Sequence, residues 1–219
     1  MLRPFYKEGI IEAGCDEAGR GCLAGPVFAA AVILPPGYHH DLVNDSKQIA
    51  PEQREILRTE IEKNAVAWAI GTASVEEIDE INILNASFLA MHRAIKKLKI
   101  IPAHLIIDGN RFKAYPDISH TCIIQGDCLF FSIAAASILA KTYRDDYMRK
   151  LHIENPCYKW SSNKGYPTPE HRSALRKYGS CTHHRTSFHL FDEQLEIIFE
   201  SSDEVHPAES DQLLKENLS

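Results

Sequence analysis

Two acidic residues stand side by side near the start of the chain, at the end of the apolar segment 10–15. They open the hexapeptide Asp16-Glu17-Ala18-Gly19-Arg20-Gly21. Adjacent carboxylates repel each other, so such a pair needs a cation or a proton to offset its charge. A Gly-X-Gly turn lets backbone N–H groups approach a ligand closely. The hexapeptide therefore predicts a divalent-metal site beside a contact to a phosphate or polynucleotide.

Two further acids follow apolar segments later in the chain. Asp108 follows residues 104–107, and Asp127 follows residues 118–125. Active sites of open α/β sheets collect at the carboxyl ends of strands, so four carboxylates converge if these ends cluster. Two Mg²⁺ or Mn²⁺ ions would relieve their repulsion, because hard cations prefer oxygen ligands. A metal pair about 3.5–4 Å apart suits in-line attack on a phosphodiester. Taken singly, Asp108-Gly109 is more typical of a turn and Asp127 of a helix N-cap, and only the combination with Asp16 and Glu17 favours a metal site.

The elements that must position these acids alternate between strands and helices. We expect strands over residues 10–15, 26–34, 65–73, 104–107 and 118–125. We expect helices over residues 51–64, 75–81, 83–98, 127–149, 169–178 and 191–199. This order predicts one α/β domain with a mixed five-stranded sheet flanked by helices. Residues 1–190 form the catalytic domain, and residues 191–219 add a C-terminal helical extension and an acidic tail that we expect to be disordered.

The charge distribution is compatible with a nucleic-acid substrate. The 219 residues carry a net charge of −6, but residues 141–185 contain ten Lys/Arg and four Asp/Glu, a local excess of +6. Residues 190–219 carry a charge of −8, which leaves +2 on residues 1–189. A basic stretch on such a nearly neutral body is typical of polynucleotide binding, although solvated helix faces give the same pattern. No apolar run reaches the roughly 18 residues of a membrane span, and no secretory signal opens the chain. We therefore expect a cytoplasmic, monomeric protein.

The six cysteines do not indicate a metal centre or a disulfide. No pair has the Cys-x-x-Cys spacing of a zinc site. Several stand in apolar runs, where a free cysteine behaves as a small buried hydrophobe. We expect all six to be reduced thiols.

Several sequence blocks resemble one family, the type 2 ribonucleases H, and specifically ribonuclease HII. The blocks follow the family's order and are Gly14 to Gly21, Ala24 to Val27, Asp45 to Lys47, Ile106 to Gly109, Gly126-Asp127, Ser132 to Lys141, Tyr143 to Asp145, Lys164 to Thr168 and His184 to Phe188. The resemblance implies the ribonuclease H fold and cleavage of the RNA strand of RNA/DNA hybrids. It also implies incision of DNA duplexes at embedded ribonucleotides, leaving 5′-phosphate and 3′-hydroxyl ends. Its catalytic and metal-binding positions are Asp16, Glu17, Asp108 and Asp127.

The resemblance also implies a substrate-recognition site. The turn Gly19-Arg20-Gly21 matches the family's reader of the ribose 2′-OH at the RNA–DNA junction, and Tyr166 matches the tyrosine that stacks on the neighbouring deoxyribose. Only the 2′-OH separates RNA from DNA at one site. The expected phosphate contacts and their neutral partners are Asn44, Ser46, Lys47, Arg144, Lys164 and Arg185. For Arg144, a salt bridge to nearby carboxylates is an equal alternative.

Three other functions share parts of this pattern. A resolvase or transposase of the same fold would have the carboxylates without needing the Gly-Arg-Gly turn. A non-catalytic hybrid-binding module would not need the acids, and a small-molecule phosphatase would not need the basic stretch. The related ribonuclease HIII group usually has lysine where this chain has Arg20, together with a sizeable N-terminal domain. Arg20 and the 15 residues before Asp16 favour ribonuclease HII.

Overall fold

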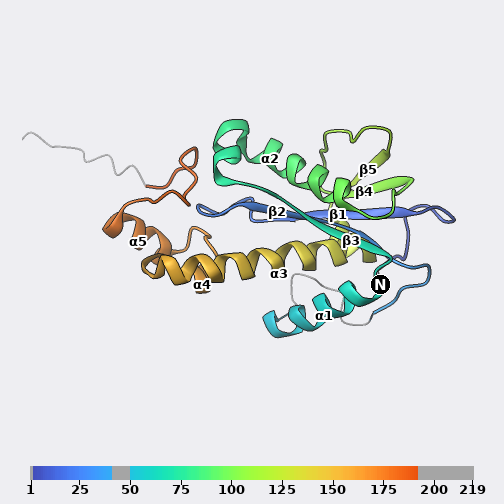
Figure 1. The fold of residues 1–219 in the computed structure, drawn as a ribbon, viewed down its shortest axis with the longest axis horizontal. Coiled ribbons are helices and arrows are strands. Elements are labelled where there is room, and N and C mark those ends of the chain that lie inside the picture. The colour runs from blue at the N-terminus through green and yellow to red at the C-terminus, as the bar shows by residue number, and fades with distance from the viewer. Residues whose placement is uncertain (1, 41–49, 192–219) are drawn as a thin grey trace, which may run out of the picture.

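A mixed five-stranded sheet forms the centre of the computed structural model, which describes residues 2–40 and 50–191 (Figure 1). The strands are β1 (Glu12–Ala18), β2 (Val27–Ile33), β3 (Ala67–Ala73), β4 (His104–Asp108) and β5 (Ser119–Ile123). Their order across the sheet is β3-β2-β1-β4-β5. β1, β4 and β5 run parallel, whereas β2 is antiparallel to both β1 and β3. The predicted fold class is therefore confirmed.

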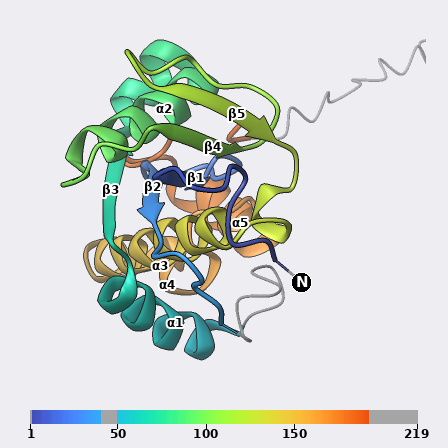
Figure 2. The ribbon, with the colours of Figure 1, turned by 90° about the vertical axis from the view of Figure 1, so that its right-hand side faces the viewer.

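Helices cover both faces of this sheet (Figure 2). The helices on its faces are α1 (Pro51–Asn64), α2 (Val75–Lys97) and α3 (Phe131–Glu154). The shorter α4 (Trp160–Asn163) and α5 (Pro169–Tyr178) lie beyond the end of the sheet, and 3-10 turns occur at η2 (Gly126–Cys128) and η3 (Pro156–Tyr158). One apolar core lies between the sheet and α2, and a second lies between the sheet, α1 and α3. β2 is buried at every position because it meets both cores. Its continuous apolar run is thereby explained.

Two glycines let the helices approach the sheet closely. A Cβ on Gly14 of β1 would lie 2.3 Å from the backbone of Ser132 in α3. A Cβ on Gly71 of β3 would lie 2.0 Å from the carbonyl oxygen of Ala90 in α2. Any side chain at either position would push a helix away. Gly14 therefore brings α3 against β1, two residues before Asp16.

Most element boundaries agree with the sequence, and one differs in a way that affects the site. Asn82 has a left-handed φ of 64° inside α2, which confirms the two predicted helical stretches on either side of it. The predicted helix from Asp127 is wrong at its start, because α3 begins at Phe131. Gln125 is left-handed, with φ 56°, and Asp127 lies in the 3-10 turn η2. Asp127 is thus not the N-cap of the long helix.

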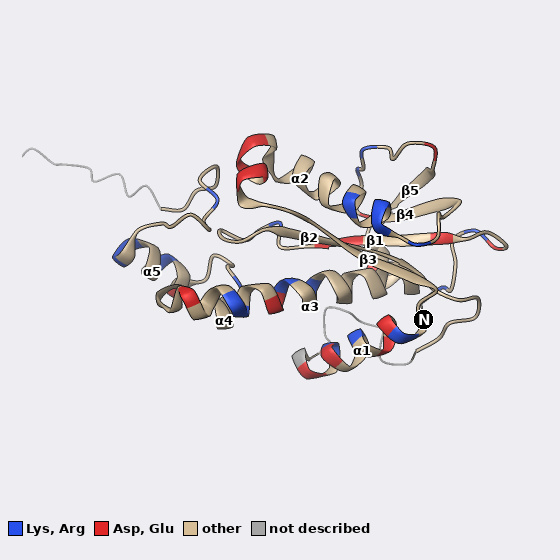
Figure 3. Ribbon diagram, viewed as in Figure 1, with Lys and Arg blue, Asp and Glu red and all other residues tan. Residues whose placement is uncertain are grey.

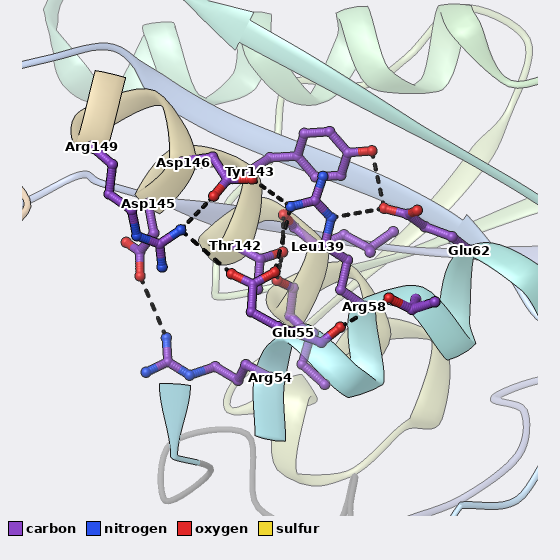
Figure 4. Close-up of polar contacts among 12 residues, drawn as sticks. Arg54, Glu55, Arg58, Glu62, Leu139, Thr142, Tyr143, Asp145, Asp146 and Arg149 are labelled. Atoms are coloured by element: carbon purple, nitrogen blue, oxygen red, sulfur yellow. Dashed lines mark hydrogen bonds and ion pairs between the residues drawn. The ribbon is translucent and has the colours of Figure 1, made fainter. Parts of the chain in front are cut away.

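An ion-pair network attaches α1 to α3 (Figure 4). Arg58 donates hydrogen bonds to Glu62 at 2.9 Å and to Asp146 at 2.6 Å. Its guanidinium lies 3.8 Å from the ring centroid of Tyr143. Asp145 pairs with Arg54 at 3.7 Å. These contacts fix the helix that follows segment 41–49. That segment lies outside the described residues, as do residues 192–219 of the predicted extension 191–219.

Two composition-based expectations can be compared with the structure. The six cysteines all lie within the described residues and form no disulfide, in agreement with the prediction of reduced thiols. Within the described ranges, no helix is both long and apolar enough to cross a membrane.

Candidate active site

The carboxyl ends of β1 and β4 bring two of the predicted acids side by side. Cys15 of β1 pairs with Ile107 of β4, so the next residues on the two strands, Asp16 and Asp108, lie side by side. Since the two strands are parallel, both acids lie at one edge of the sheet. Glu17 follows Asp16 on β1.

The fourth acid reaches the same edge through the turn after β5. The backbone N–H of Gly126 donates a 2.7 Å hydrogen bond to Asp108 Oδ1, and Asp127 is the next residue. Gly126 has no room for a side chain, because a Cβ there would lie 2.6 Å from the Ile133 side chain in α3. The ends of three parallel strands therefore contribute one set of carboxylates, the acidic cluster, which comprises Asp16, Glu17, Asp108 and Asp127.

The acidic cluster buries negative charge that its surroundings only partly balance. Asp16 is 6% exposed and Asp127 is 4% exposed. Burial raises the pKa of Asp16 well above its usual range, and the charges of Glu17 and Asp108 raise it further. The Ser137 hydroxyl and the Glu17 amide, 2.7 Å away, counteract part of this effect on Asp16. Burial also raises the pKa of Glu17, while Arg20 at 3.1 Å opposes that shift.

The cluster has the ligand chemistry of a divalent-metal site but not an assembled coordination sphere. Its oxygen donors suit a hard cation such as Mg²⁺ or Mn²⁺, and the repulsion within it would be relieved by one. Within residues 2–40 and 50–191, no three His, Cys, Asp or Glu side chains are arranged so that they could hold one ion. Asp108 is bound to the Gly126 amide and Glu17 to Arg20. The residues thus fit a metal by donor type.

The Gly-Arg-Gly turn lies directly after the acidic cluster and faces outward. The side chain of Arg20 is 51% exposed, and Gly21 is exposed. Gly19 has a φ of +96°, and a Cβ there would lie 2.1 Å from Arg144 Nε. Glycine is therefore required at position 19 for both its backbone conformation and its packing.

Tyr166 lies on a loop that is bonded to the segment following this turn. The Leu23 amide donates to the Gly165 carbonyl at 2.8 Å. A Cβ on Gly165 would lie 2.7 Å from the Ala24 carbonyl oxygen, so the two backbones touch. Tyr166 is 40% exposed. The structure thus places the predicted sugar-contacting residues next to one another.

Two predicted phosphate contacts are corrected by the structure. Arg144 is 1% exposed and Arg185 is fully buried. Their guanidinium groups donate to backbone carbonyl oxygens and not into solvent. Within the described residues, the three nitrogen atoms of Arg144 donate to carbonyl oxygens and not to a carboxylate, so the alternative of a salt bridge is not seen there either; the neighbouring Asp145 pairs with Arg54. A basic residue in a sequence block gives no sign of whether its charge faces outward.

The remaining predicted phosphate contacts fall into two groups. Lys164 is half-buried, its ammonium group donates to the Ser161 carbonyl, and burial lowers its pKa. Asn44, Ser46 and Lys47 lie outside the described residues.

Sequence reasoning missed several residues that support the site. Ser137 hydrogen-bonds to Asp16 from α3. The carboxylate of Asp79 accepts four hydrogen bonds from Thr186 and Ser187, which follow Arg185. His171 contacts the Tyr166 carbonyl through Nδ1 at 2.9 Å and His184 through Nε2 at 3.2 Å. Apart from His171 and Tyr166, which are five residues apart, the partners in these pairs are at least 13 residues apart in sequence, so no local pattern reveals them.

Comparison with known proteins identifies the family. The family model for ribonuclease HII matches residues 13–191. A ribonuclease HII of Bacteroides fragilis is 65% identical over 198 residues, covering 90% of this chain and 98% of that protein. The ribonuclease H2 of Pyrococcus horikoshii OT3 is similar in structure, with a TM-score of 0.67 and 25% identity, over 82% of this chain and 94% of that chain.

A more distant structure has the same fold. Bst-RNase HIII, solved in complex with Mn²⁺, has a TM-score of 0.63 at 16% identity and covers 83% of this chain and 68% of that chain. The match over residues 13–191 spans the acidic cluster, the Gly-Arg-Gly turn and Tyr166. The chain therefore belongs to the ribonuclease HII family and is an endoribonuclease that acts on RNA/DNA hybrids.

Proposed function

We propose that the acidic cluster is the catalytic centre and that the enzyme also incises DNA duplexes at embedded ribonucleotides, leaving 5′-phosphate and 3′-hydroxyl ends. The observation that carries this proposal is the meeting of Asp16, Glu17, Asp108 and Asp127 at one sheet edge, where burial and mutual repulsion raise the pKa of Asp16. A site that concentrates negative charge beside an outward-facing turn suits a cation-assisted reaction on a polyanion.

The four carboxylates would hold the divalent ions. Two Mg²⁺ or Mn²⁺ ions, when bound, would supply activation of water and stabilisation of the charge on the leaving 3′-oxygen. The Mn²⁺ bound by Bst-RNase HIII supports this choice of cation. A ligand set built from strand ends is rigid, because sheet register fixes the backbone of Asp16 and Asp108.

The chain's own residues orient the cluster before any substrate arrives. Ser137 and the Glu17 amide bond to Asp16, and the Gly126 amide holds Asp108. Glu17 is bridged to Arg20, so the cluster is tied directly to the Gly-Arg-Gly turn. A change in the position of Arg20 on contact with the sugar would therefore reach a catalytic carboxylate.

The basic stretch of residues 141–185 supports a nucleic-acid substrate. Its Lys and Arg recur along α3 and α5, with Asp and Glu interspersed on α3 (Figure 3). Phosphate contacts from such residues orient a duplex without reading its sequence. We assign Lys164 to this role, together with Asn44, Ser46 and Lys47, whose positions are outside the described residues.

Strand-cleavage mapping on three labelled duplexes tests the proposal. One duplex carries a single ribonucleotide, one is a continuous RNA/DNA hybrid, and one is all DNA, and each is incubated with Mg²⁺ or Mn²⁺. We expect cleavage of the first two with either metal, products with 5′-phosphate and 3′-hydroxyl ends, and no cleavage after chelation. Cleavage of the all-DNA duplex would instead favour a resolvase-type nuclease, and activity in chelator would overturn the metal assignment.

A further inference from the structure

Arg144 and Arg185, the arginine pair, are buried beneath the segment that contains the Gly-Arg-Gly turn. Each guanidinium uses all three of its nitrogen atoms as hydrogen-bond donors to backbone carbonyl oxygens. Arg185 donates to Arg20 at 2.9 Å and twice to Gly25, at 3.0 and 2.8 Å; Arg144 donates to Pro26 at 3.1 Å, Ala24 at 3.1 Å and Lys164 at 2.9 Å. Five of the six bonds thus go to residues 20–26.

Simple packing does not explain two buried cations at this place. Transfer of a charge out of water is strongly unfavourable, and an apolar side chain would fill the same space without that cost. Burial lowers the pKa of Arg185 to about 10, so the group is still charged at neutral pH. A guanidinium offers a planar fork that can hold several carbonyl oxygens in fixed directions, which an apolar side chain cannot.

The direction of these carbonyl groups sets the direction of the neighbouring N–H groups. The peptide bonds of the described residues are trans, so the C=O and N–H of each peptide plane point in opposite directions. Because Arg185 holds the Arg20 carbonyl inward, the Gly21 N–H points away from the protein interior. Gly21 is exposed, so this N–H lies on the solvent side of the turn.

Arg144 connects the same turn to Tyr166. Its Nε lies so close to Gly19 that a Cβ there would be 2.1 Å away. It also holds the carbonyl of Lys164, and its guanidinium carbon lies 5.9 Å from the centroid of the Tyr166 ring. One cationic group therefore sets the spacing between the turn and the tyrosine.

Backbone hydrogen bonds also attach the segment after the turn to residues 183–185. The Gly25 amide donates to the His183 carbonyl at 2.8 Å, and the Arg185 amide donates to the Leu23 carbonyl at 2.9 Å. The segment that follows the turn is thus held by two distant parts of the chain, near residues 164–166 and 183–185.

We propose that Arg185 and Arg144 are positioning residues for ribonucleotide selection: they hold the backbone of residues 20–26 so that the Gly-Arg-Gly turn and Tyr166 present a fixed surface to the sugars at an RNA–DNA junction. The inference rests on the proposed function, because it assumes that this turn reads the ribose. It assigns the two arginines to specificity and not to phosphate binding.

The test compares lysine variants, which keep the positive charge but lose the fork. Arg185→Lys and Arg144→Lys are assayed under single-turnover conditions on the single-ribonucleotide duplex and on the continuous hybrid. A displacement of about 1 Å at a reacting centre can reduce a rate on the order of 10²-fold. We expect a loss of this size in kcat/KM on the single-ribonucleotide duplex, a smaller loss on the hybrid, and duplex affinity close to that of the wild type.

The matched control is Arg93→Lys, an arginine on α2 whose fork pairs with Glu77 away from the basic stretch, and for which we expect no change in either assay. Folded lysine variants that cut both substrates as the wild type does would overturn the inference, as would equal losses on both substrates. Failure of the wild type to cut the single-ribonucleotide duplex would instead overturn the proposed function, and this inference with it.

A measurement on the wild type covers the case in which the lysine variants do not fold. Arginine Nε–H signals are followed by nitrogen-15 NMR on the protein alone and on the protein mixed with each duplex, in the absence of divalent metal. We expect two Nε–H groups that exchange slowly with water and shift with the single-ribonucleotide duplex but not with the all-DNA duplex. Rapid exchange of all arginines, or the same response to both duplexes, would contradict the inference.

Discussion

The acidic cluster and the arginine pair lie in neighbouring parts of the molecule, and both bury charge, but they balance it differently. At the cluster, burial and neighbouring carboxylates raise the pKa of Asp16, and a hydroxyl and an amide only partly compensate. Under the Gly-Arg-Gly turn, every guanidinium nitrogen of Arg144 and Arg185 has a carbonyl acceptor.

The acidic cluster would therefore be stabilised by an incoming ligand, whereas the arginine pair already has its hydrogen-bond partners. A cation entering the acidic cluster would stabilise it, because it would relieve the repulsion between carboxylates. The arginine pair has no such need and serves as a fixed support. Removal of a charge should therefore have opposite effects on stability in the two regions.

The largest expected effect is on activity, from Asp16→Asn. The change removes one carboxylate charge without changing side-chain size. Electrostatic stabilisation by a bound metal is worth several kcal/mol, which corresponds to a rate loss of roughly 10³-fold or more. Since burial disfavours the charged form of Asp16, the metal-free variant should be at least as stable as the wild type. Single-turnover cleavage and urea unfolding measure both effects, and normal cleavage would contradict the catalytic assignment.

The opposite stability effect is expected from Arg144→Met. The variant fills similar space but leaves the buried carbonyls of Ala24, Pro26 and Lys164 without their donor. Each unsatisfied buried group costs about 1–3 kcal/mol, so we expect a loss of roughly 3 kcal/mol or more in the free energy of unfolding.

The exposed Arg176→Met serves as its control and should change the free energy of unfolding by less than about 0.5 kcal/mol. If the two variants unfold at the same urea concentration, the arginine pair is not the support that its geometry indicates.

Acid should weaken the support of the turn through His184. Burial, together with repulsion from His171, lowers the pKa of His184 to about 4. Because an unfolded histidine has a pKa of about 6.5, the unfolded chain takes up the proton first as the pH falls. Stability is therefore fully present above about pH 6.5 and is lost between there and about pH 4, by on the order of 3 kcal/mol.

Urea unfolding at several pH values between 7 and 4.5 measures this loss. His184→Gln should remove part of the pH dependence, whereas the exposed His189→Gln should leave it unchanged. An identical pH dependence in all three proteins would show that His184 does not carry the effect.

The smallest stability effect is expected where the two regions meet, from Arg20→Ala. The Arg20–Glu17 pair is half-exposed on the arginine side, and such pairs contribute about 0–1 kcal/mol. The loss of Arg20 should nevertheless raise the pKa of Glu17 further, because the positive charge of Arg20 opposes the upward shift that burial causes. Arg20→Ala should therefore change the thermal unfolding temperature little but clearly reduce the rate of cleavage of the single-ribonucleotide duplex.

The sequence by itself determined the fold class and the family, and it supplied the four acids that we propose as catalytic. Apolar runs ending in Asp16, Asp108 and Asp127 predicted strand ends and a shared edge, because periodicity and turn residues are local signals. The break in α2 at Asn82 was also predictable. The start of α3 was not, because the conformation of Gln125 and the 3-10 turn after it depend on packing around Asp108 and Ile133.

Only the tertiary structure decided which charges face outward. Lys164, Arg144 and Arg185 are alike as members of a basic stretch, yet the last two are buried and bound to carbonyls 118 to 165 residues away in sequence, apart from the Lys164 carbonyl. Burial and the choice of hydrogen-bond partner depend on which distant segments meet. The sequence thus identified the acidic cluster and the turn, and the fold showed what holds the turn in place.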